Sequence, residues 1–333
     1  MAGKRDSSRP KAAAAERELI AGIRRHADKL LMGQRKSGIL TLGIGDDCAV
    51  LRPRRAKEIV VTTDLSLENV HFRRDWHPPQ SVGHRCLARG LSDLAAMGAR
   101  PEAAFLSLAL PEELTGEWME RFFNGFMALA ERCQVPLAGG DTAKAPMVIA
   151  DIVLLGSVPR GEALLRSAAR AGDLLYVTGA LGGSAAELLA LEQRPENFRQ
   201  SSTAGHPHLF PEPRLAAGRK TRRLATAAID VSDGLSTDLA HLCEESGLAA
   251  EVDAAALPID ARATLEQALH GGEDYELLFA ASPKKLIPKH LGGVSVHRIG
   301  RMKKCGKGPQ VTLDRDGVRT ELVAAGWEHF RQL

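Results

Sequence analysis

The chain has 333 residues, which is more than a single ordinary domain needs and suits two domains. Its composition, 44% hydrophobic and 26% charged, is typical of soluble globular proteins, and its net charge of +3 is too small to indicate a polyanionic partner. Aromatic residues make up only 4%, so we expect no stacking surface for single-stranded nucleic acid and no nucleic-acid partner.

The first residues, 1–14, are basic and rich in alanine, and they lack the apolar core and cleavage pattern of a secretory signal. No apolar run reaches the roughly 18 residues that cross a bilayer. The five cysteines contain no CxxC pair, which argues against a zinc site or a disulfide framework. We therefore expect a disordered tail on a cytoplasmic protein with free thiols and no membrane partner.

After this tail the periodicity of apolar residues alternates between that of helices and that of strands. Helices are predicted over 15–31, 81–98 and 116–134, and strands over 38–45, 58–64, 102–111 and 147–158. Pro159 and Gly161 interrupt the pattern near residues 155–170. Beyond them we expect a strand, glycine turn and helix over 173–193 and strands over 227–232 and 275–282. The chain is thus predicted to be an α/β (α+β) protein with domains at 15–158 and 159–333.

Acidic residues recur where predicted strands end, often beside glycine. One acid in such a place is usually a turn former or a helix cap. Several acids on one edge of a sheet would share a pocket and require a counter-charge, and Mg²⁺ with phosphates supplies one. The helix that follows Gly234 would add backbone N–H groups for an anion. The acids are Asp46, Asp47, Asp64, Asp141, Asp230 and Asp233, with Asp93 on a helix in the same half.

Several common sequence motifs of phosphate and hydrolytic enzymes are missing from the chain. It contains no G-x-x-x-x-G-K-[ST] loop, no protein-kinase motif set, no G-x-S-x-G and no H-E-x-x-H. The residues alone therefore predict an α/β protein with a multi-aspartate Mg²⁺ site that acts on phosphates. A Mg²⁺-dependent phosphohydrolase and a nucleotide sensor both stay open at this point.

Seven motifs occur in an order that is specific in combination. They are "GIGDDCAVL", "TTDLSLENVHF", "LSDLAAMGA", "LAGGDT", "LLRSAARAGDLLYVTG", "IDVSDGLSTDL" and "GGEDYELLF". From about residue 15 to the end, the chain resembles the thiamine-monophosphate kinase family, which belongs to the superfamily named after aminoimidazole ribonucleotide synthetase. The resemblance implies a two-domain fold of mixed sheets covered by helices, without a P-loop.

The resemblance also implies an activity, its cofactors and its partners. The activity is the ATP-dependent phosphorylation of thiamine monophosphate to thiamine diphosphate, the last step of thiamine diphosphate biosynthesis. Mg²⁺ ions would assist the transfer, and the enzyme would be a homodimer. Because the attacking atom is a phosphate oxygen, direct in-line transfer without a general base is expected. Another ATP-dependent synthetase of the superfamily is the alternative, but the "VHF" and "GGEDYELL" segments favour the kinase.

The family's functional residues fall on three groups of positions in this sequence. The metal ligands would be Asp47, Thr62, Thr63, Asp64, Asp93, Asp141, Asp230 and Asp233. The ATP-binding residues would be Gly140, Asp141, Arg166 and Ser232. The substrate-binding residues would be His71, Glu273 and Trp327. The chain departs from the family at Asn69, where glycine is common, and we expect the turn to survive because Asn tolerates a left-handed backbone.

Overall fold

The computed structural model describes residue 23 and residues 39–42, 49–198, 205–308 and 310–327. The basic tail, most of the helix predicted over 15–31, and the acids Asp46 and Asp47 lie outside the described residues. None of the described helices is long and apolar enough to cross a membrane. Among the described cysteines Cys86 and Cys243 are buried, and all of those described are free thiols.

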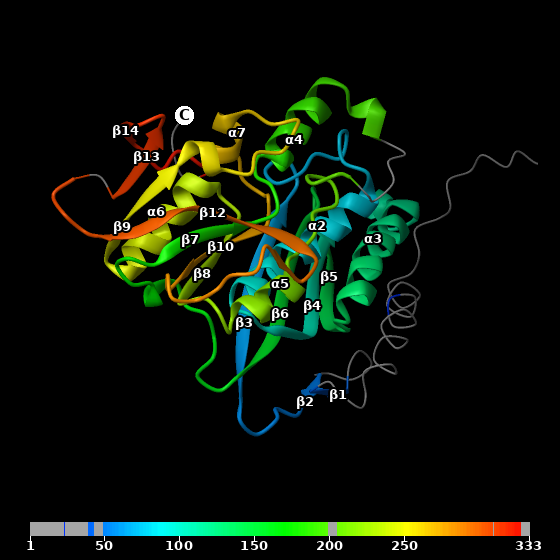
Figure 1. Ribbon diagram of the computed structural model, residues 1–333. Helices are drawn as coiled ribbons and strands as arrows, with labels where there is room; N and C mark the ends of the chain where they lie inside the picture. The colour runs from blue at the N-terminus through cyan, green and yellow to red at the C-terminus, as the bar shows by residue number, and fades with distance from the viewer. Residues whose placement is uncertain (1–22, 24–38, 43–48, 199–204, 309, 328–333) are drawn as a thin grey trace, which may run out of the picture.

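The first half of the described chain is a four-stranded sheet with two long helices on one face (Figure 1). The strands lie in the order β3-β6-β4-β5, and only β4 and β5 run parallel. A small hairpin packs on the other face of β4 through Leu40 and Phe105. The elements are β1 (Leu40–Leu42), β2 (Val50–Leu51), β3 (Lys57–Leu67), α2 (Pro79–Ala96), β4 (Arg100–Leu110), η1 (Glu112–Leu114), α3 (Glu117–Cys133), β5 (Leu137–Lys144) and β6 (Ile149–Pro159).

The second half is built on an eight-stranded sheet in the order β14-β13-β9-β12-β7-β10-β8, with β11 paired to β12. Its pairs are antiparallel except for β9 with β13. The strands are β7 (Leu174–Thr178), β8 (Ala227–Val231), β9 (Leu248–Asp253), β10 (Glu276–Ala281), β11 (His290–Leu291), β12 (Val294–Lys304), β13 (Val311–Arg315) and β14 (Val318–Glu321). The helices are η2 (Arg166–Ala168), α4 (Gly183–Gln193), η3 (Pro195–Phe198), α5 (Leu215–Thr221), α6 (Leu235–Ser246), η4 (Ala254–Ala256) and α7 (Leu265–His270).

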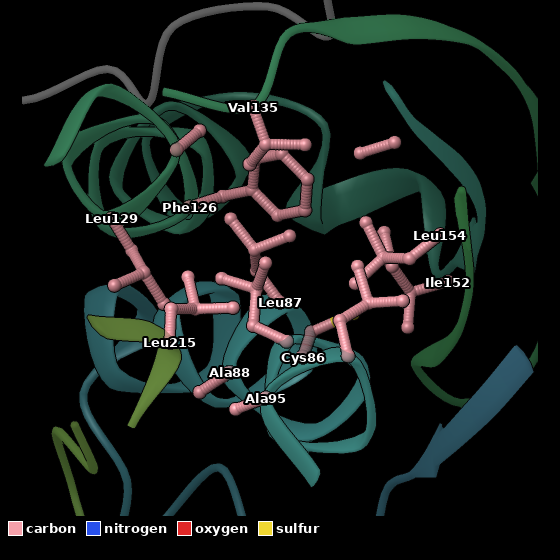
Figure 2. Packing of buried hydrophobic residues seen from close by; sticks show 14 of the residues in the cluster. Cys86, Leu87, Ala88, Ala95, Phe126, Leu129, Val135, Ile152, Leu154 and Leu215 are labelled. Atoms are coloured by element: carbon pink, nitrogen blue, oxygen red, sulfur yellow. The ribbon is translucent and has the colours of Figure 1, made fainter. Parts of the chain in front are cut away.

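Helix α2 lies between the two halves and is buried along most of its length. It begins at Pro79, where proline's missing N–H leaves no helical hydrogen bond unmade. Its Leu87 packs in one cluster with Phe126 of α3 and Leu154 of β6 (Figure 2), and this cluster continues to Phe279 of the second sheet. Because both sheets pack around α2, side chains on this helix can reach residues of either half.

The predicted fold class is confirmed: two mixed sheets carry helices on their faces. The predicted position of the acids at strand ends holds for Asp230, one residue before the end of β8, but is wrong in detail for Asp64 and Asp141, because β3 continues to Leu67 and β5 to Lys144. The sequence analysis predicted no strand at β12, which ends in the basic residues "RMKK". That strand buries Ile299 and Met302 but exposes its charged residues, which hides the alternation.

Candidate active site

A cavity of about 590 Å³ opens between the two halves. Its wall is formed by β3, α2, the loop after β3, the start of α4, the β8–α6 turn, the segment 272–275 and the described C-terminal end. This cavity brings together predicted site residues that are far apart in the sequence. They are Asp64, His71, Asp93, Asp230, Ser232, Asp233, Glu273 and Trp327.

One end of the cavity is lined by Asp64, Asp93 and Asp230, which we call the acidic cluster. Thr62 and Asp64 point to the same side of β3, toward α2, and the Thr62 hydroxyl donates a hydrogen bond to Asp93. The hydroxyl of Ser92, also on α2, donates to Asp230 Oδ2 at 2.6 Å. Adjacent residues of α2 therefore bond to both sheets, Asp93 to Thr62 of β3 and Ser92 to Asp230 of β8.

The acidic cluster holds more negative charge than its neighbours compensate. Burial and the charge of Asp93 raise the pKa of Asp64 to about 6. The same two causes, in the same order, raise the pKa of Asp230 to about 7. Burial raises the pKa of Asp93 as well. Carboxylates in this condition favour a bound cation, and an all-oxygen donor set fits Mg²⁺.

The turn before α6 is held by a side chain of the helix itself. The N–H groups of Ser232, Asp233 and Gly234 all donate to Oδ2 of Asp238, at 3.0, 3.1 and 3.1 Å. These three N–H groups are therefore already taken, and the prediction of an anion at the helix start stays a prediction for the residues that follow, from Leu235 on. Asp233 itself lines the cavity, and its carboxylate lies within 4.8 Å of ligand atoms of Asp238 and His241.

At the other end of the cavity the acid is Glu273. Both of its oxygens accept hydrogen bonds from Arg85 Nη2, at 2.7 Å each. Burial acts to raise the pKa of Glu273, but Arg85, His208 and Arg89 outweigh it and hold the pKa well below its ordinary value. Glu273 is thus a carboxylate whose charge the chain itself balances.

The backbone around Glu273 is held in an unusual conformation. Glu273 and Tyr275 have left-handed φ angles of 64° and 51°, which cost energy for residues other than glycine. Hydrogen bonds from their N–H groups to the carbonyls of Ser232 and Val231, at 2.7 and 2.9 Å, fix this shape. Between them Asp274 turns away and accepts the N–H of Gly182 at 2.7 Å at the start of α4. The segment therefore directs Glu273 into the cavity and Asp274 out of it.

His71 and Trp327 lie at the mouth of the cavity. The N–H of Leu67 donates to His71 Nδ1 at 3.0 Å, and Asn69 between them has a φ of 66°, so the expectation that asparagine keeps this left-handed turn is confirmed. The N–H of Trp327 donates to the carbonyl of Asp233 at 3.0 Å. The preceding Gly326 comes so close that an added Cβ would lie 2.0 Å from that carbonyl oxygen, which explains why glycine stands there.

Other predicted residues lie outside the cavity. Asp64 and Gly140 belong to one row across the first sheet, three strand spacings or about 14 Å apart. Asp141 and Thr63 point to the opposite face of that sheet, which the described residues leave uncovered apart from the β1–β2 hairpin, so Thr63 could meet the acidic cluster only through its backbone. Gly140 is suited to its place because an added Cβ would lie 1.9 Å from the Leu106 carbonyl oxygen.

Exposed Arg166 lies near enough to the acidic cluster to oppose the raised pKa values of Asp93 and Asp230. Asp47 lies outside the described residues.

A buried histidine network that the sequence did not suggest lies beside Glu273, at the end of the cavity opposite the acidic cluster. The ring nitrogens His77 Nε2 and His208 Nε2 lie 3.0 Å apart, and Ser184 Oγ lies 3.0 Å from His208 Nδ1. Burial, then the charge of Arg85, lowers the pKa of His77 to about 3 and that of His208 well below 6.5. Both rings are therefore neutral near pH 7. No motif in the sequence indicated that His208 is buried.

Sequence reasoning also omitted the cations of α2. Arg85 and Arg89 precede Asp93 at intervals of four residues, the spacing that places side chains on one helical face. Read together with the predicted helix over 81–98, that spacing would have placed both arginines beside Asp93.

Comparisons with known proteins identify the family of the chain. Residues 45–158 match the family described as "AIR synthase related protein, N-terminal domain", and residues 170–308 match its C-terminal domain. Thiamine-monophosphate kinase from Salmonella typhimurium is 38% identical over 304 residues, 86% of this chain and 91% of that protein. The enzyme of the same name from Bacillus subtilis is 33% identical, over 87% of this chain and 94% of that protein.

Solved structures give the same picture. The crystal structure of thiamine-monophosphate kinase from Stenotrophomonas maltophilia K279a superposes with a TM-score of 0.77 at 36% identity, covering 93% of this chain and 98% of that one. A structure described as "AaThiL complexed with AMPPCP and TMP" has a TM-score of 0.74 at 31% identity, covering 91% and 96%. The hydrogenase maturation protein HypE in complex with ATP shares the fold at 18% identity, with a TM-score of 0.75 and 96% coverage of each chain.

Proposed function

Because the chain belongs to the thiamine-monophosphate kinase family, we propose that it transfers the γ-phosphoryl group of ATP to the phosphate of thiamine monophosphate. The observation that carries this proposal is one cavity with two chemically different ends. The acidic cluster suits cations and phosphates, and the end around Glu273 and Trp327 suits an organic cation. A relative at 31% identity is described in complex with AMPPCP and TMP, which supports one site for both substrates.

The residues present fit Mg²⁺ at the acidic end. Asp64, Asp93, Asp230 and Asp233 would hold the ions, and the proposal extends to Asp47, Asp141, Thr62 and Thr63. Bound Mg²⁺ would neutralise phosphate charge and so lower the repulsion between the two anionic substrates. Gly140, Asp141, Arg166 and Ser232 are proposed for the ATP side.

The acceptor requires no general base. A phosphate monoester has a second pKa of about 6, so its attacking oxygen is mostly deprotonated near pH 7. That oxygen forms a bond to the γ-phosphorus while the bond to the ADP oxygen breaks, and ADP leaves with the electron pair. The neutral, mutually paired His77 and His208 therefore need not take up a proton.

The substrate end would position the thiamine rings. His71, Glu273 and Trp327 line it, together with the half-buried side chains of Trp76 and Leu188. The ionised Glu273 suits a cationic ring system, and the apolar side chains suit its flat faces. This division assigns phosphate chemistry mainly to one end and recognition to the other.

We also propose that the protein acts as a homodimer. The uncovered face of the first sheet exposes Val61 by 61% and Leu65 by 44%, and Val153 and Leu155 of β6 lie beside them. Open apolar strands of this kind are usually covered by a partner. A monomeric mass in light scattering at micromolar concentration would contradict this. The domains at 15–158 and 159–333 and a cytoplasmic location belong to the same proposal.

One assay tests the activity. The protein is incubated with ATP, Mg²⁺ and thiamine monophosphate, and we expect thiamine diphosphate and ADP in equal amounts. Phosphate release from ATP without the thiamine substrate would indicate a phosphohydrolase instead. With a chiral γ-phosphate we expect inversion of configuration, and retention or an isolable phosphoenzyme would contradict direct transfer.

A further inference from the structure

One face of α2 runs along the cavity from its substrate end to the acidic cluster. Arg85, Arg89 and Asp93 follow one another at intervals of four residues on this face. With a rise of about 1.5 Å per residue, they stand about 6 Å apart along the helix axis. Arg85 binds Glu273 at one end, and Asp93 joins the acidic cluster at the other. Arg89 therefore lies where the two ends meet.

The guanidinium of Arg89 has charged neighbours, but no described carboxylate lies closer to it than 3.5 Å. Its Nε lies 3.6 Å from Asp64 Oδ1, and its Nη1 lies 3.5 Å from Glu273 Oε1. Both distances exceed that of a charge-assisted hydrogen bond, about 2.8 Å. Buried Nε has no hydrogen-bond partner among the described atoms. The side chain is 17% exposed and lines the cavity, so its remaining donors are accessible from there.

Arg85, unlike Arg89, is closely paired with a carboxylate. It satisfies both oxygens of Glu273 at 2.7 Å, so that carboxylate does not depend on Arg89 for its charge balance. Arg214, a third arginine at a buried acid, likewise holds Glu276 at 2.6 and 2.9 Å. Arg89 alone among these three keeps its carboxylates at longer distances. A buried cation in this state favours an additional anionic ligand.

We propose that Arg89 binds the phosphate group of the acceptor and so selects a phosphate monoester over the unphosphorylated alcohol. The acceptor phosphate must lie between the ring-binding end and the acidic cluster, which is the position of Arg89. A guanidinium presents paired N–H donors that match two oxygens of a phosphate. Binding there would orient the attacking oxygen toward the acidic cluster. The proposal rests on the proposed function for the identity of the phosphate ester.

The test compares two ligands on one set of variants. Binding of thiamine monophosphate and of thiamine is measured by calorimetry, with Mg²⁺ present and without ATP. For Arg89→Met we expect thiamine monophosphate to bind at least tenfold more weakly, since a hydrogen bond to a charged group contributes about 1.5–3 kcal/mol. Thiamine binding should change less than twofold. Arg89→Lys, which keeps the charge but loses the fork, should fall between wild type and Arg89→Met.

A matched control removes an equal charge elsewhere. Arg121→Met changes an arginine of α3 that lies outside the cavity, and it should leave both affinities unchanged. Equal loss of both ligands in Arg89→Met, or no loss of either, would overturn the proposal and make Arg89 a structural residue. If Arg89→Met does not fold, Arg89→Lys carries the same comparison. A wild-type protein that forms no thiamine diphosphate would contradict the proposed function, yet a phosphate preference that depends on Arg89 would still stand.

Discussion

The two ends of the cavity place the same functional group in opposite electrostatic states. At the acidic cluster, burial and mutual repulsion raise the pKa of Asp64 to about 6 and that of Asp230 to about 7. At the substrate end, Arg85 at 2.7 Å holds the pKa of Glu273 well below its ordinary value despite burial. The presence of a carboxylate in this cavity therefore does not by itself show whether its pKa is raised or lowered. The position of the nearest guanidinium decides whether the negative charge of the carboxylate is already compensated by the protein or favours a bound cation.

The largest effect is expected where the charge is unbalanced. Asp93→Asn should lower turnover about a thousandfold, or about 4 kcal/mol, because a shared ligand of the cations is lost. The same change should raise the melting temperature of the metal-free protein, since it removes one of several mutually repelling acids. Turnover at saturating Mg²⁺ and melting with a chelator present measure the two effects. Exposed Asp316→Asn is the control, and near-normal turnover of Asp93→Asn would contradict the comparison.

At the end of the cavity around Glu273, we expect a substitution of the carboxylate to lower the stability of the metal-free protein instead of raising it. Glu273→Gln leaves Arg85 buried without its carboxylate, so the free energy of unfolding should fall by about 3 kcal/mol. Chemical denaturation of the metal-free protein measures it. A Glu273→Gln variant more stable than wild type would show that repulsion between carboxylates dominates at both ends of the cavity. The electrostatic difference between the two ends would then not exist.

A smaller effect is expected on the pH dependence of the free energy of unfolding, through the buried His77. His77 has a pKa of about 3 in the folded protein because of burial and Arg85, against about 6.5 when unfolded. Between these values the unfolded state binds more protons, so this residue's contribution to stability is complete above pH 6.5 and is lost as the pH falls. From pH 7 to pH 5 the loss is about 2 kcal/mol.

His77→Asn should therefore reduce the difference in unfolding free energy between pH 7 and pH 5 by about that amount. Denaturation of wild type and variant at both pH values measures it. The carboxylates titrate in both proteins and cancel in the comparison. An unchanged difference would mean that His77 is accessible to protons in the folded state.

The smallest effect is expected at the mouth of the cavity. Trp327 is 52% exposed, so only part of its ring is available to cover a bound substrate. Trp327→Ala should raise KM for thiamine monophosphate about fivefold, or about 1 kcal/mol, with little change in kcat. A KM unchanged within twofold, measured by initial rates, would place the ring outside the substrate's reach.

The sequence predicted the architecture well because its signals are local. The long amphipathic runs predicted α2 and α3 within two residues at each end, and apolar runs predicted β3, β4 and β6. The resemblance then identified Asp93 and Asp230, whose meeting depends on the packing of two sheets around one helix. No local signal could reveal that contact.

Other features of the site could not be predicted because they depend on competition between neighbours. Asp238 accepts the N–H groups of Ser232, Asp233 and Gly234, an arrangement set by side-chain geometry within one turn. Thr63 and Asp141 carry suitable oxygens but lie on the uncovered face. Arg85 and Arg89 are the same residue type four positions apart, yet only Arg85 is closely paired.

The hydrogen bond from Trp327 to the carbonyl of Asp233 gives the described end of the chain a second significance. The carbonyl of Asp233, a proposed metal ligand, accepts the backbone N–H of Trp327, so cation binding at Asp233 and docking of the backbone at residue 327 are thermodynamically linked. Whatever stabilises the position of Asp233 also stabilises the docked chain end, by the same free energy in either direction. Amide hydrogen exchange at Trp327 would therefore report the ionic state of the site.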